Sequence, residues 1–319
     1  FLISEITSKS LQAKISAIQL AAEPCIESTK ILIFIFFNLL HVFLRKIVNS
    51  LFGKVTVPEG HTIHRAARDH HKLFRNQKLF VSSPQGRFTD GAAILNGQIC
   101  LSVEAFGKHL IYNFDQGDVL HIHLGLFGRI RKRKLPGAEP RGAVRVRFIG
   151  KTHVIDINGP TICRVLTKKE LLSLIDRIGP DVLRSDANPE LAFNKISKSR
   201  SPIGRLIMDQ SVMAGIGNIY RSEILWRQAI HPEIPGREID KPTFGRIWED
   251  AKLLLEIGVK KNAIVTIKNA PSSKTRYRER VNIFAKDTCP KCLGSIRRFE
   301  ISGRRTYVCE ICQPRYLNQ

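Results

Sequence analysis

Four of the seven cysteines form two close pairs near the end of the 319-residue chain. Cys289 and Cys292 make one Cys-x-x-Cys pair, and Cys309 and Cys312 make a second pair after 16 intervening residues. Each pair can lie on a tight knuckle, and four thiolates can surround one Zn²⁺ ion as a tetrahedron. Because so short a segment cannot bury a sufficient core, we expect one structural zinc ion here. A redox Cys-x-x-Cys motif is the alternative, and the presence of two pairs disfavours it.

A second candidate site is the glycine-containing segment 206–221. We expect a helix to end around Ser211 and another to begin at Asn218, a good N-cap residue. Between them, Gly215 and Gly217 allow positive φ angles and a close approach of the backbone. Backbone N–H groups at a helix start can bind phosphate, so the segment predicts a phosphate site. An ordinary helical hairpin that needs glycine for packing is the alternative.

The tripeptide Pro58-Glu59-Gly60 is informative because of what a proline can do at a chain terminus. A terminal proline has a secondary amine, which can attack an aldehyde and form a Schiff base. A proline inside a chain has an amide nitrogen, which is not a nucleophile. We therefore hypothesise that Val57 represents a GTG start codon read as methionine, whose removal exposes the amine of Pro58. Residues 1–57 are then a non-native upstream extension; proteolytic processing and an inactive protein are the alternatives.

The charge of the chain points to a polyanionic partner. The formal net charge is +23, and residues 1–57 account for only +3 of it, from six Lys/Arg and three Asp/Glu. A basic globular body of this kind usually binds nucleic acid; a ribosomal protein and a protein of acidic membrane surfaces are the alternatives. The apolar run Ile31–Leu44 is shorter than the roughly 20 residues of a spanning helix, so a membrane anchor is a minor alternative. The cysteine pattern favours a reducing compartment.

The elements that must position these residues follow from periodicity. Short alternating runs from residue 78 to about 163 predict an antiparallel β-sandwich or barrel. Turn residues over 179–189 predict a connector, and helical patterning follows it. We expect helices over 62–74, 167–178 (with Thr167 as N-cap), 189–196, 203–210, 219–228 and 241–259, and an exposed loop over 268–279. We expect strands over 108–114, 119–124, 143–148, 153–157, 296–301 and 304–309, the last two forming a hairpin that the metal ties together.

Taken together, these segments resemble the formamidopyrimidine-DNA glycosylase/endonuclease VIII family of base-excision repair enzymes, most closely its actinobacterial endonuclease VIII type. Pro58–Arg65 resembles the N-terminus of the family, and Gly107–Leu110 resembles its catalytic-lysine strand. Met208–Glu223 resembles its helix–two-turns–helix motif, and Gly303–Gln313 resembles its zinc finger. It covers essentially all of 58–319 and none of 1–56. The implied fold is α+β: an N-terminal antiparallel β-sandwich flanked by helices (58–180), a helical domain with the helix–two-turns–helix motif (181–285) and a four-cysteine zinc finger (286–319).

The resemblance implies a bifunctional DNA glycosylase/AP lyase that removes oxidised bases, pyrimidines being favoured, and nicks DNA at abasic sites. Pro58 matches the nucleophile that attacks C1′ of the damaged nucleotide, and Glu59 matches the carboxylate that handles protons. Lys108 matches a lysine that contacts phosphate beside the lesion and supports catalysis. Arg304 matches the zinc-finger arginine that binds phosphate, and we group it with the catalytic residues.

The resemblance also implies a set of DNA-binding residues. Asn218 matches the phosphate-binding asparagine of the glycine turn, which contains Gly215 and Gly217. Glu223 matches a buried glutamate near the active site, and we group it with the DNA-binding residues. The implied partners are damaged double-stranded DNA and abasic sites, without a membrane partner.

The segment His121–Gly128 resembles the wedge loop of the family. We expect Leu126 and Phe127 to fill the gap left by an everted base, because apolar wedges lower the cost of unstacking. The alternative is that both are core residues of a strand. The basic run Arg129–Lys134 follows, and we expect a loop close to the DNA backbone; a solvated basic strand end is the alternative. We interpret His61, His64 and His121 as structural.

The chain departs from the family pattern in two places. Residues 281–284 lack an arginine that the family often has before the zinc finger, and the 57-residue extension has no counterpart. We expect a monomer in the bacterial cytoplasm, associated with the nucleoid. Two other functions stay open: a non-catalytic damaged-DNA-binding protein, if Pro58 is not the mature N-terminus, and a membrane-tethered nucleic-acid binder that uses Ile31–Leu44.

Overall fold

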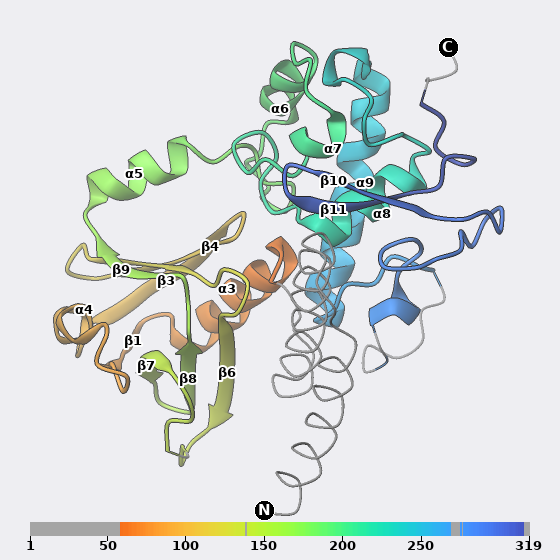
Figure 1. Ribbon diagram of the computed structural model, residues 1–319. Helices are drawn as coiled ribbons and strands as arrows, with labels where there is room; N and C mark the ends of the chain where they lie inside the picture. Colours follow the sequence, from red (N-terminus) through yellow and green to blue (C-terminus); the bar gives the residue numbers. More distant parts are fainter. Residues whose placement is uncertain (1–57, 138, 269–274, 276, 316–319) are drawn as a thin grey trace, which may run out of the picture. The chain divides into compact units, whose positions relative to one another are not determined.

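The computed structural model describes residues 58–137, 139–268, 275 and 277–315 (Figure 1). The chain divides into two compact units, 1–56 and 57–319, and all described residues belong to the second. The expectations for the extension, including Ile31–Leu44, and for most of the loop 268–279 therefore lie outside the described residues. No helix in the described part of the chain is long and apolar enough to cross a bilayer.

Two antiparallel sheets form the first domain and confirm the predicted sandwich (Figure 1). The larger sheet has the strand order β1-β3-β4-β5-β9, and the smaller has the order β2-β7-β8-β6. Their facing sides enclose one apolar core that includes Leu110, Ile122, Phe148 and Ile155. The strands are β1 (Gln77–Lys78), β2 (Phe80–Ser82), β3 (Ile99–Phe106), β4 (His109–Phe114), β5 (Val119–His123), β6 (Arg129–Lys134), β7 (Val144–Ile149), β8 (His153–Asn158) and β9 (Ile162–Leu166).

Helix α3 (Gly60–Phe74) is amphipathic, as predicted, but begins two residues earlier than expected, with Glu59 at its N-cap position. Its apolar face, which includes Ile63 and Phe74, joins the core of the sandwich. Helix α5 (Lys168–Asp176) has the predicted N-cap, because Thr167 and Glu170 form a capping box. A short helix that was not predicted, α4 (Thr89–Leu95), contacts β2.

The second domain is helical and has its own apolar core, which includes Ile207, Tyr220, Ile224 and Leu255. Helices α8 and α9 agree with the prediction to within two residues at each end. The elements are α6 (Pro189–Ile196), α7 (Ile203–Leu206), α8 (Asn218–Arg227), η1 (Gly236–Glu238), α9 (Lys241–Lys261) and η2 (Tyr277–Arg280).

The expected helix over 203–210 was wrong in length, because α7 ends at Leu206. After it, the carboxylate of Asp209 accepts a hydrogen bond from the backbone N–H of Ser211 at 2.9 Å. The side-chain oxygen of Gln210 accepts one from the backbone N–H of Gly215 at 3.0 Å. Polar side chains that bond to nearby backbone groups offer the chain an alternative to helix, and here they close a turn.

A two-stranded hairpin, β10 (Arg297–Ile301) and β11 (Arg304–Val308), follows in the order that the sequence predicted. Ser302 and Gly303 form its turn, and both have positive φ angles. The buried Tyr307 and Ile296 pack with the cysteine-containing loops in a small separate core.

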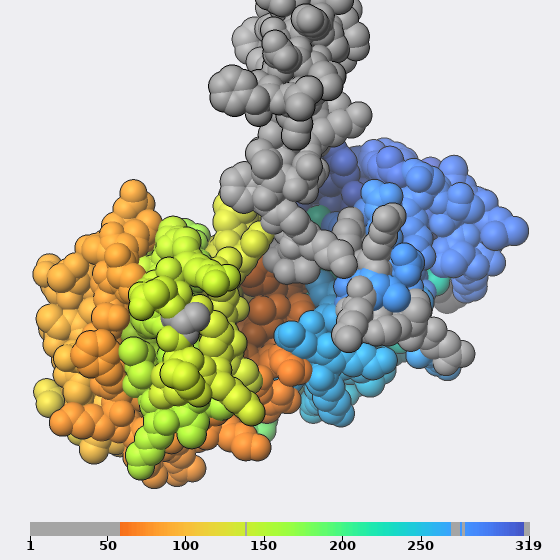
Figure 2. All heavy atoms as spheres, turned by 90° about the horizontal axis from the view of Figure 1, so that it is seen from below, coloured from red at the N-terminus to blue at the C-terminus, as the bar shows by residue number. Residues whose placement is uncertain are grey.

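Helix α3 connects the two domains. It contacts β3 and β4 of the sandwich and also α9 of the helical domain, and Figure 2 shows its orange surface between the yellow-green sandwich and the cyan end of α9. The guanidinium of Arg65 donates to the carbonyl of Val259 at 2.7 Å, near the C-terminal end of α9. The backbone N–H of Gly60 donates to the carbonyl of Gly215 at 2.8 Å. The start of α3 therefore lies directly against the glycine turn.

Candidate active site

The carboxylate of Glu59 caps the start of α8. Its two oxygens accept hydrogen bonds from the backbone N–H groups of Gly217 and Ile219, both at 3.0 Å. The expectation that Asn218 is the N-cap was wrong, because the cap position is Gly217 and Asn218 is the first residue of the helix. A carboxylate at a helix N-terminus is favoured by the unpaired N–H groups and the helix dipole, and here it comes from the other domain.

The two glycines of the turn serve different purposes. Gly215 has a φ of +92°, as expected for a residue chosen for its backbone freedom. Gly217 has a φ of −122°, so the expected positive φ was wrong there. A Cβ on Gly217 would lie 2.3 Å from Cδ of Glu59. Gly217 is therefore needed because the carboxylate approaches its Cα closely.

Burial and hydrogen bonding act on the pKa of Glu59 in opposite directions. The side chain is 1% exposed, and this burial raises its pKa above the ordinary value, although Lys108 and the backbone N–H groups of α8 oppose the shift. A carboxyl with a raised pKa keeps its proton to a higher pH than an ordinary glutamic acid, which suits a proton donor.

Lys108 lies beside the same carboxylate. It occupies the turn between β3 and β4 rather than the strand that was expected. Its Nζ donates to the carbonyl of Ile216 at 2.8 Å, within the glycine turn. Burial lowers the pKa of Lys108, with Glu59 opposing the shift and Arg304 adding to it. The fold thus gathers Glu59, Lys108, the glycine turn and the charge of Arg304, and Pro58 is the half-buried residue directly before Glu59.

Asn218 connects the glycine turn to the hairpin β10–β11, which lies between the two cysteine pairs. Its side-chain N–H donates to the carbonyl of Arg305 at 3.0 Å, and its oxygen accepts from the guanidinium of Arg221 at 2.5 Å. Arg304 and Arg305 are exposed at the start of β11, as expected for residues that reach a phosphate. The start of α8 and the hairpin are therefore held together through Asn218.

Arg221 is a site residue that the sequence analysis missed. It is fully buried, and burial lowers its pKa to about 10. Its guanidinium donates to Asn218, to Thr306 Oγ1 at 2.8 Å and to the carbonyl of Arg305 at 3.1 Å. Its position three residues after Asn218 places both on one helix face, a spacing that was visible in the sequence.

The wedge candidates are exposed rather than buried. Leu126 is 40% exposed and Phe127 is 71% exposed, in a turn between β5 and β6. The alternative that they are core residues of a strand was wrong. The following run Arg129–Lys134 is β6, at the edge of the smaller sheet, so it is a strand and not a loop. Its closeness to a DNA backbone stays a prediction.

Glu223 does not fit among the DNA contacts. Its side chain is fully buried, and it accepts hydrogen bonds from the backbone N–H groups of Asn282, Ile283 and Phe284 at 2.7, 2.8 and 2.9 Å. It also accepts from Thr266 Oγ1 at 2.5 Å. All of these donors belong to the protein, so Glu223 holds residues 282–284, the segment before the first cysteine pair, in place.

The three histidines that were interpreted as structural make contacts within the protein. His61 is buried and packs edge-on against Tyr220, and burial lowers its pKa to about 3. His64 donates to Asp181 at 2.6 Å. His121 of β5 forms a hydrogen bond with His109 of the neighbouring strand β4, at 2.8 Å between ring nitrogens.

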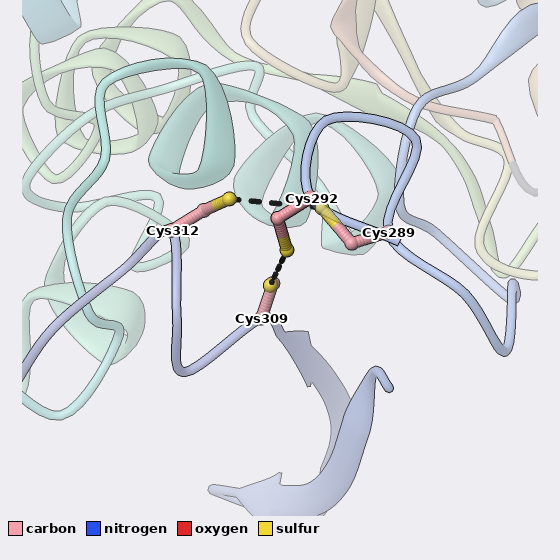
Figure 3. Close-up of side chains that lie close together, drawn as sticks. All are labelled: Cys289, Cys292, Cys309 and Cys312. Carbon is pink, nitrogen blue, oxygen red and sulfur yellow. Dashed lines mark hydrogen bonds between the residues drawn. The ribbon is translucent and has the colours of Figure 1, made fainter. Parts of the chain in front are cut away.

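The four cysteines converge as the spacing predicts (Figure 3). All four sulfur atoms lie within 4.8 Å of one another, with Cys289–Cys312 at 3.8 Å and Cys292–Cys309 at 3.4 Å. A tetrahedron with Zn–S bonds of about 2.3 Å has edges of about 3.8 Å, so the donor set fits a structural zinc ion. The indole N–H of Trp226, from α8, lies 3.4 Å from the Cys289 sulfur and ties the cluster to the helical domain.

Comparisons with known proteins agree with this architecture. The Formamidopyrimidine-DNA glycosylase N-terminal domain matches residues 57–159, and the Formamidopyrimidine-DNA glycosylase H2TH domain matches residues 178–269. Endonuclease 8 1 of Mycobacterium tuberculosis is 42% identical over 267 residues, which cover 81% of this chain and 100% of that protein. Formamidopyrimidine-DNA glycosylase of Chloroflexus aggregans is 27% identical over 243 residues, covering 70% of this chain and 83% of that protein.

A solved structure shares the fold. The complex between Lactococcus lactis Fpg and DNA containing an abasic site has a TM-score of 0.68 at 21% identity, covering 81% of this chain and all of that one. The domains, the glycine turn and the four-cysteine cluster define a class of DNA glycosylases that are also AP lyases, enzymes of base-excision repair. Within this class, the chain belongs to the formamidopyrimidine-DNA glycosylase/endonuclease VIII family.

Proposed function

We propose that this chain excises oxidised bases, with a preference for pyrimidines, through a Schiff base formed on the amine of Pro58. The observation that carries the proposal is the convergence of Glu59 and Lys108 on the glycine turn, with Pro58 one residue before Glu59. The match to the family's N-terminal domain begins at residue 57, one residue before Pro58, which supports the proposal. The preference for pyrimidines rests on the resemblance to the endonuclease VIII type and on the 42% identity to Endonuclease 8 1.

The proposed reaction begins with attack of the Pro58 nitrogen on C1′ of the damaged nucleotide. The bond from C1′ to the base breaks, and its electron pair leaves with the base, which takes up a proton. Glu59 is suited to supply protons for base departure and opening of the sugar ring, because burial keeps its carboxyl protonated to a higher pH. The Pro58 nitrogen loses its proton after the attack, the ring oxygen takes up a proton as its bond to C1′ breaks, and the nitrogen lone pair forms an iminium with C1′.

Strand cleavage follows from the iminium. It acidifies the C2′ hydrogen, so loss of that proton and of the 3′ phosphate is a β-elimination that breaks the strand. Hydrolysis of the iminium by water then frees the Pro58 amine. In this proposal Lys108 and Arg304 bind the phosphates beside the lesion, and the side chain of Asn218 binds a further phosphate. The backbone N–H groups of Gly217 and Ile219, which the sequence analysis assigned to phosphate, are instead bonded to Glu59.

We propose that one zinc ion, held by the four cysteines, fixes the hairpin that carries Arg304 and Arg305. Such an ion would have a structural role and no catalytic one, because four thiolates leave it no open position for water or substrate. The exposed Leu126 and Phe127 would occupy the gap in the duplex when the damaged nucleotide is everted.

Base release and strand cleavage can be measured on duplexes that carry a single 5-hydroxyuracil, a single 8-oxoguanine or an abasic site. We expect the protein that starts at Pro58 to cleave the abasic duplex and to excise 5-hydroxyuracil faster than 8-oxoguanine. The compact unit 57–319 contains the three main cores, so this shortened protein is a suitable sample. Absence of cleavage at the abasic site would refute the proposed lyase, and faster excision of 8-oxoguanine would refute the pyrimidine preference.

If Pro58 is not the mature N-terminus, the same fold can bind damaged DNA without catalysis. The full 319-residue chain provides the comparison, since its Pro58 nitrogen is an amide. We expect it to bind abasic-site DNA through the same phosphate contacts and to form no Schiff base.

A further inference from the structure

The carboxylate of Asp181 lies at the junction between the two domains and takes no part in the chemistry described above. It follows Gly179 and Pro180 in the connector, and the residue is 4% exposed. Three hydrogen-bond donors from three separate parts of the chain converge on it: the His64 ring, the Gly107 backbone N–H and the Leu183 backbone N–H. Such convergence on one buried carboxylate fixes the segments that supply the donors.

Two of these donors are close in sequence to the catalytic residues. The backbone N–H of Gly107 donates to Asp181 Oδ2 at 2.6 Å, and Gly107 directly precedes Lys108. His64 Nε2 donates to the same oxygen at 2.6 Å, and His64 lies one turn of α3 after Gly60. One carboxylate oxygen therefore holds both the turn of Lys108 and the first turn of the helix that follows Glu59.

The remaining contacts of Asp181 fix the carboxylate itself. Its other oxygen accepts from the Leu183 backbone N–H at 3.0 Å. The backbone of Asp181 pairs with Ala214 in a parallel bridge, directly before the glycine turn. Gly107 has a φ of +59°, and a Cβ there would lie 2.9 Å from the Ala214 Cβ. The Lys108 turn, the connector and the glycine turn are thus in close contact around this carboxylate.

We propose that Asp181 is a positioning residue for the reaction, acting through Gly107 on Lys108 and through His64 on the start of α3. In this role it sets the distance between Lys108, Glu59 and the glycine turn, and it touches neither substrate nor reacting atoms. The inference rests on the proposed function of Pro58, Glu59 and Lys108.

The contrasting possibility is that Asp181 contributes only to folding stability. The two can be separated because positioning affects the rate of the chemical step more than it affects DNA binding. A misplacement of about 1 Å at a reacting group costs about 100-fold in rate. Binding of an unreactive abasic analogue depends on many phosphate contacts, of which the proposed Lys108 contact is one.

The experiment uses the protein that starts at Pro58 and measures two quantities for each variant. The first is the single-turnover rate of borohydride-trapped adduct with abasic-site DNA, and the second is the Kd for the same duplex with a tetrahydrofuran analogue. The variants are Asp181→Asn, His64→Ala and His64→Gln, in which glutamine keeps a side-chain N–H donor. Asp186→Asn is the matched control, because Asp186 is an exposed acid of the same connector that pairs with Arg184.

We expect Asp181→Asn and His64→Ala to lower the trapping rate by about tenfold or more while the Kd changes by less than about threefold. We expect His64→Gln to recover most of the rate and Asp186→Asn to match the unsubstituted protein. Should Asp181→Asn fail to fold, the pair of His64 variants carries the same comparison.

Unchanged trapping rates in the variants, or rates and Kd values that worsen by the same factor, would overturn the inference. A loss that His64→Gln shares equally with His64→Ala would overturn it as well. Failure of the proposed function has a different signature: the unsubstituted protein then forms no adduct, and the inference falls with it.

Discussion

Replacing Gly217 with alanine tests whether the position of the Glu59 carboxylate controls the chemistry. An ideal Cβ at residue 217 would lie 2.3 Å from Cδ and 2.7 Å from Oε1 of Glu59. Carbon atoms in contact are normally about 3.5–4.0 Å apart, so the carboxylate has to move by more than about 1 Å. The backbone angles of Gly217, φ −122° and ψ −167°, are open to alanine, so the substitution adds no backbone strain.

The expected effect follows from that displacement. Moving the carboxylate breaks or stretches its hydrogen bonds to the N–H groups of Gly217 and Ile219. A displacement of about 1 Å at a catalytic group costs about 100-fold, equivalent to about 2.7 kcal/mol in the barrier. We therefore expect Gly217→Ala to lower the single-turnover rate of base excision by about 100-fold while the protein still folds.

Base release from a 5-hydroxyuracil duplex measures the rate, and thermal unfolding checks the fold. Gly245→Ala is the control, because Gly245 lies within α9 and has nothing within 4 Å of its ideal Cβ. We expect the control to keep full activity and to gain up to about 1 kcal/mol of stability. If folded Gly217→Ala excised the base within about threefold of the unsubstituted rate, the role assigned to the position of Glu59 would be refuted.

Three further outcomes are expected. If the four cysteines hold the proposed zinc ion, chelation or Cys309→Ser should lower the unfolding temperature and weaken DNA binding, because the hairpin would lose its tie; unchanged binding by the metal-free protein would contradict this. The pKa of His121 is lowered to about 3 by burial, with His109 adding to the shift. Below pH 6.5 the unfolded chain therefore binds a proton at His121 that the folded chain does not, so the free energy of unfolding falls as the pH drops towards 3. We expect His121→Asn to reduce the slope of the unfolding free energy against pH by up to about 1.4 kcal/mol per pH unit. An unchanged slope would contradict the assignment. Phe127→Ala should slow base excision from duplex DNA by about tenfold at unchanged unfolding temperature, whereas Leu172→Ala, which removes an exposed apolar residue of α5, should not.

The sequence predicted the elements whose signals are local. The alternating runs indicated the sandwich, Thr167 indicated an N-cap, and the cysteine spacing indicated the cluster. These features depend on contacts between residues close in the chain or on one strong chemical preference. The structure confirms them with boundary differences of one or two residues for most elements.

The features that the sequence analysis missed depend on contacts across long separations. Asn218 has the residue type of an N-cap, yet Glu59, 159 residues earlier, supplies the capping carboxylate. For Gly217 the sequence suggested a positive φ or a close approach of the backbone, and only the structure shows that the approaching group is the Glu59 carboxylate. Helix and turn propensities describe the preferences of a segment by itself, so they cannot predict a contact with a side chain from another domain.

Buried charged residues were hard to assign for the same reason. Glu223 belongs to a segment that resembles a DNA-binding motif, but its carboxylate is used entirely by protein donors. Arg221 and Asp181 were not singled out, although each joins segments that are distant in the chain. A buried ion needs several partners, and only the folded chain shows which residues supply them.

The central claim is that the amine of Pro58 attacks C1′ of the damaged nucleotide. The most direct measurement is borohydride reduction of the protein bound to abasic-site DNA, followed by digestion and mass mapping of the modified peptide. The protein that starts at Pro58 is predicted to carry one reduced sugar adduct on the Pro58 nitrogen, and the full 319-residue chain is predicted to carry none there. An adduct on Lys108 or another lysine, or no adduct on the protein that starts at Pro58, would contradict the claim.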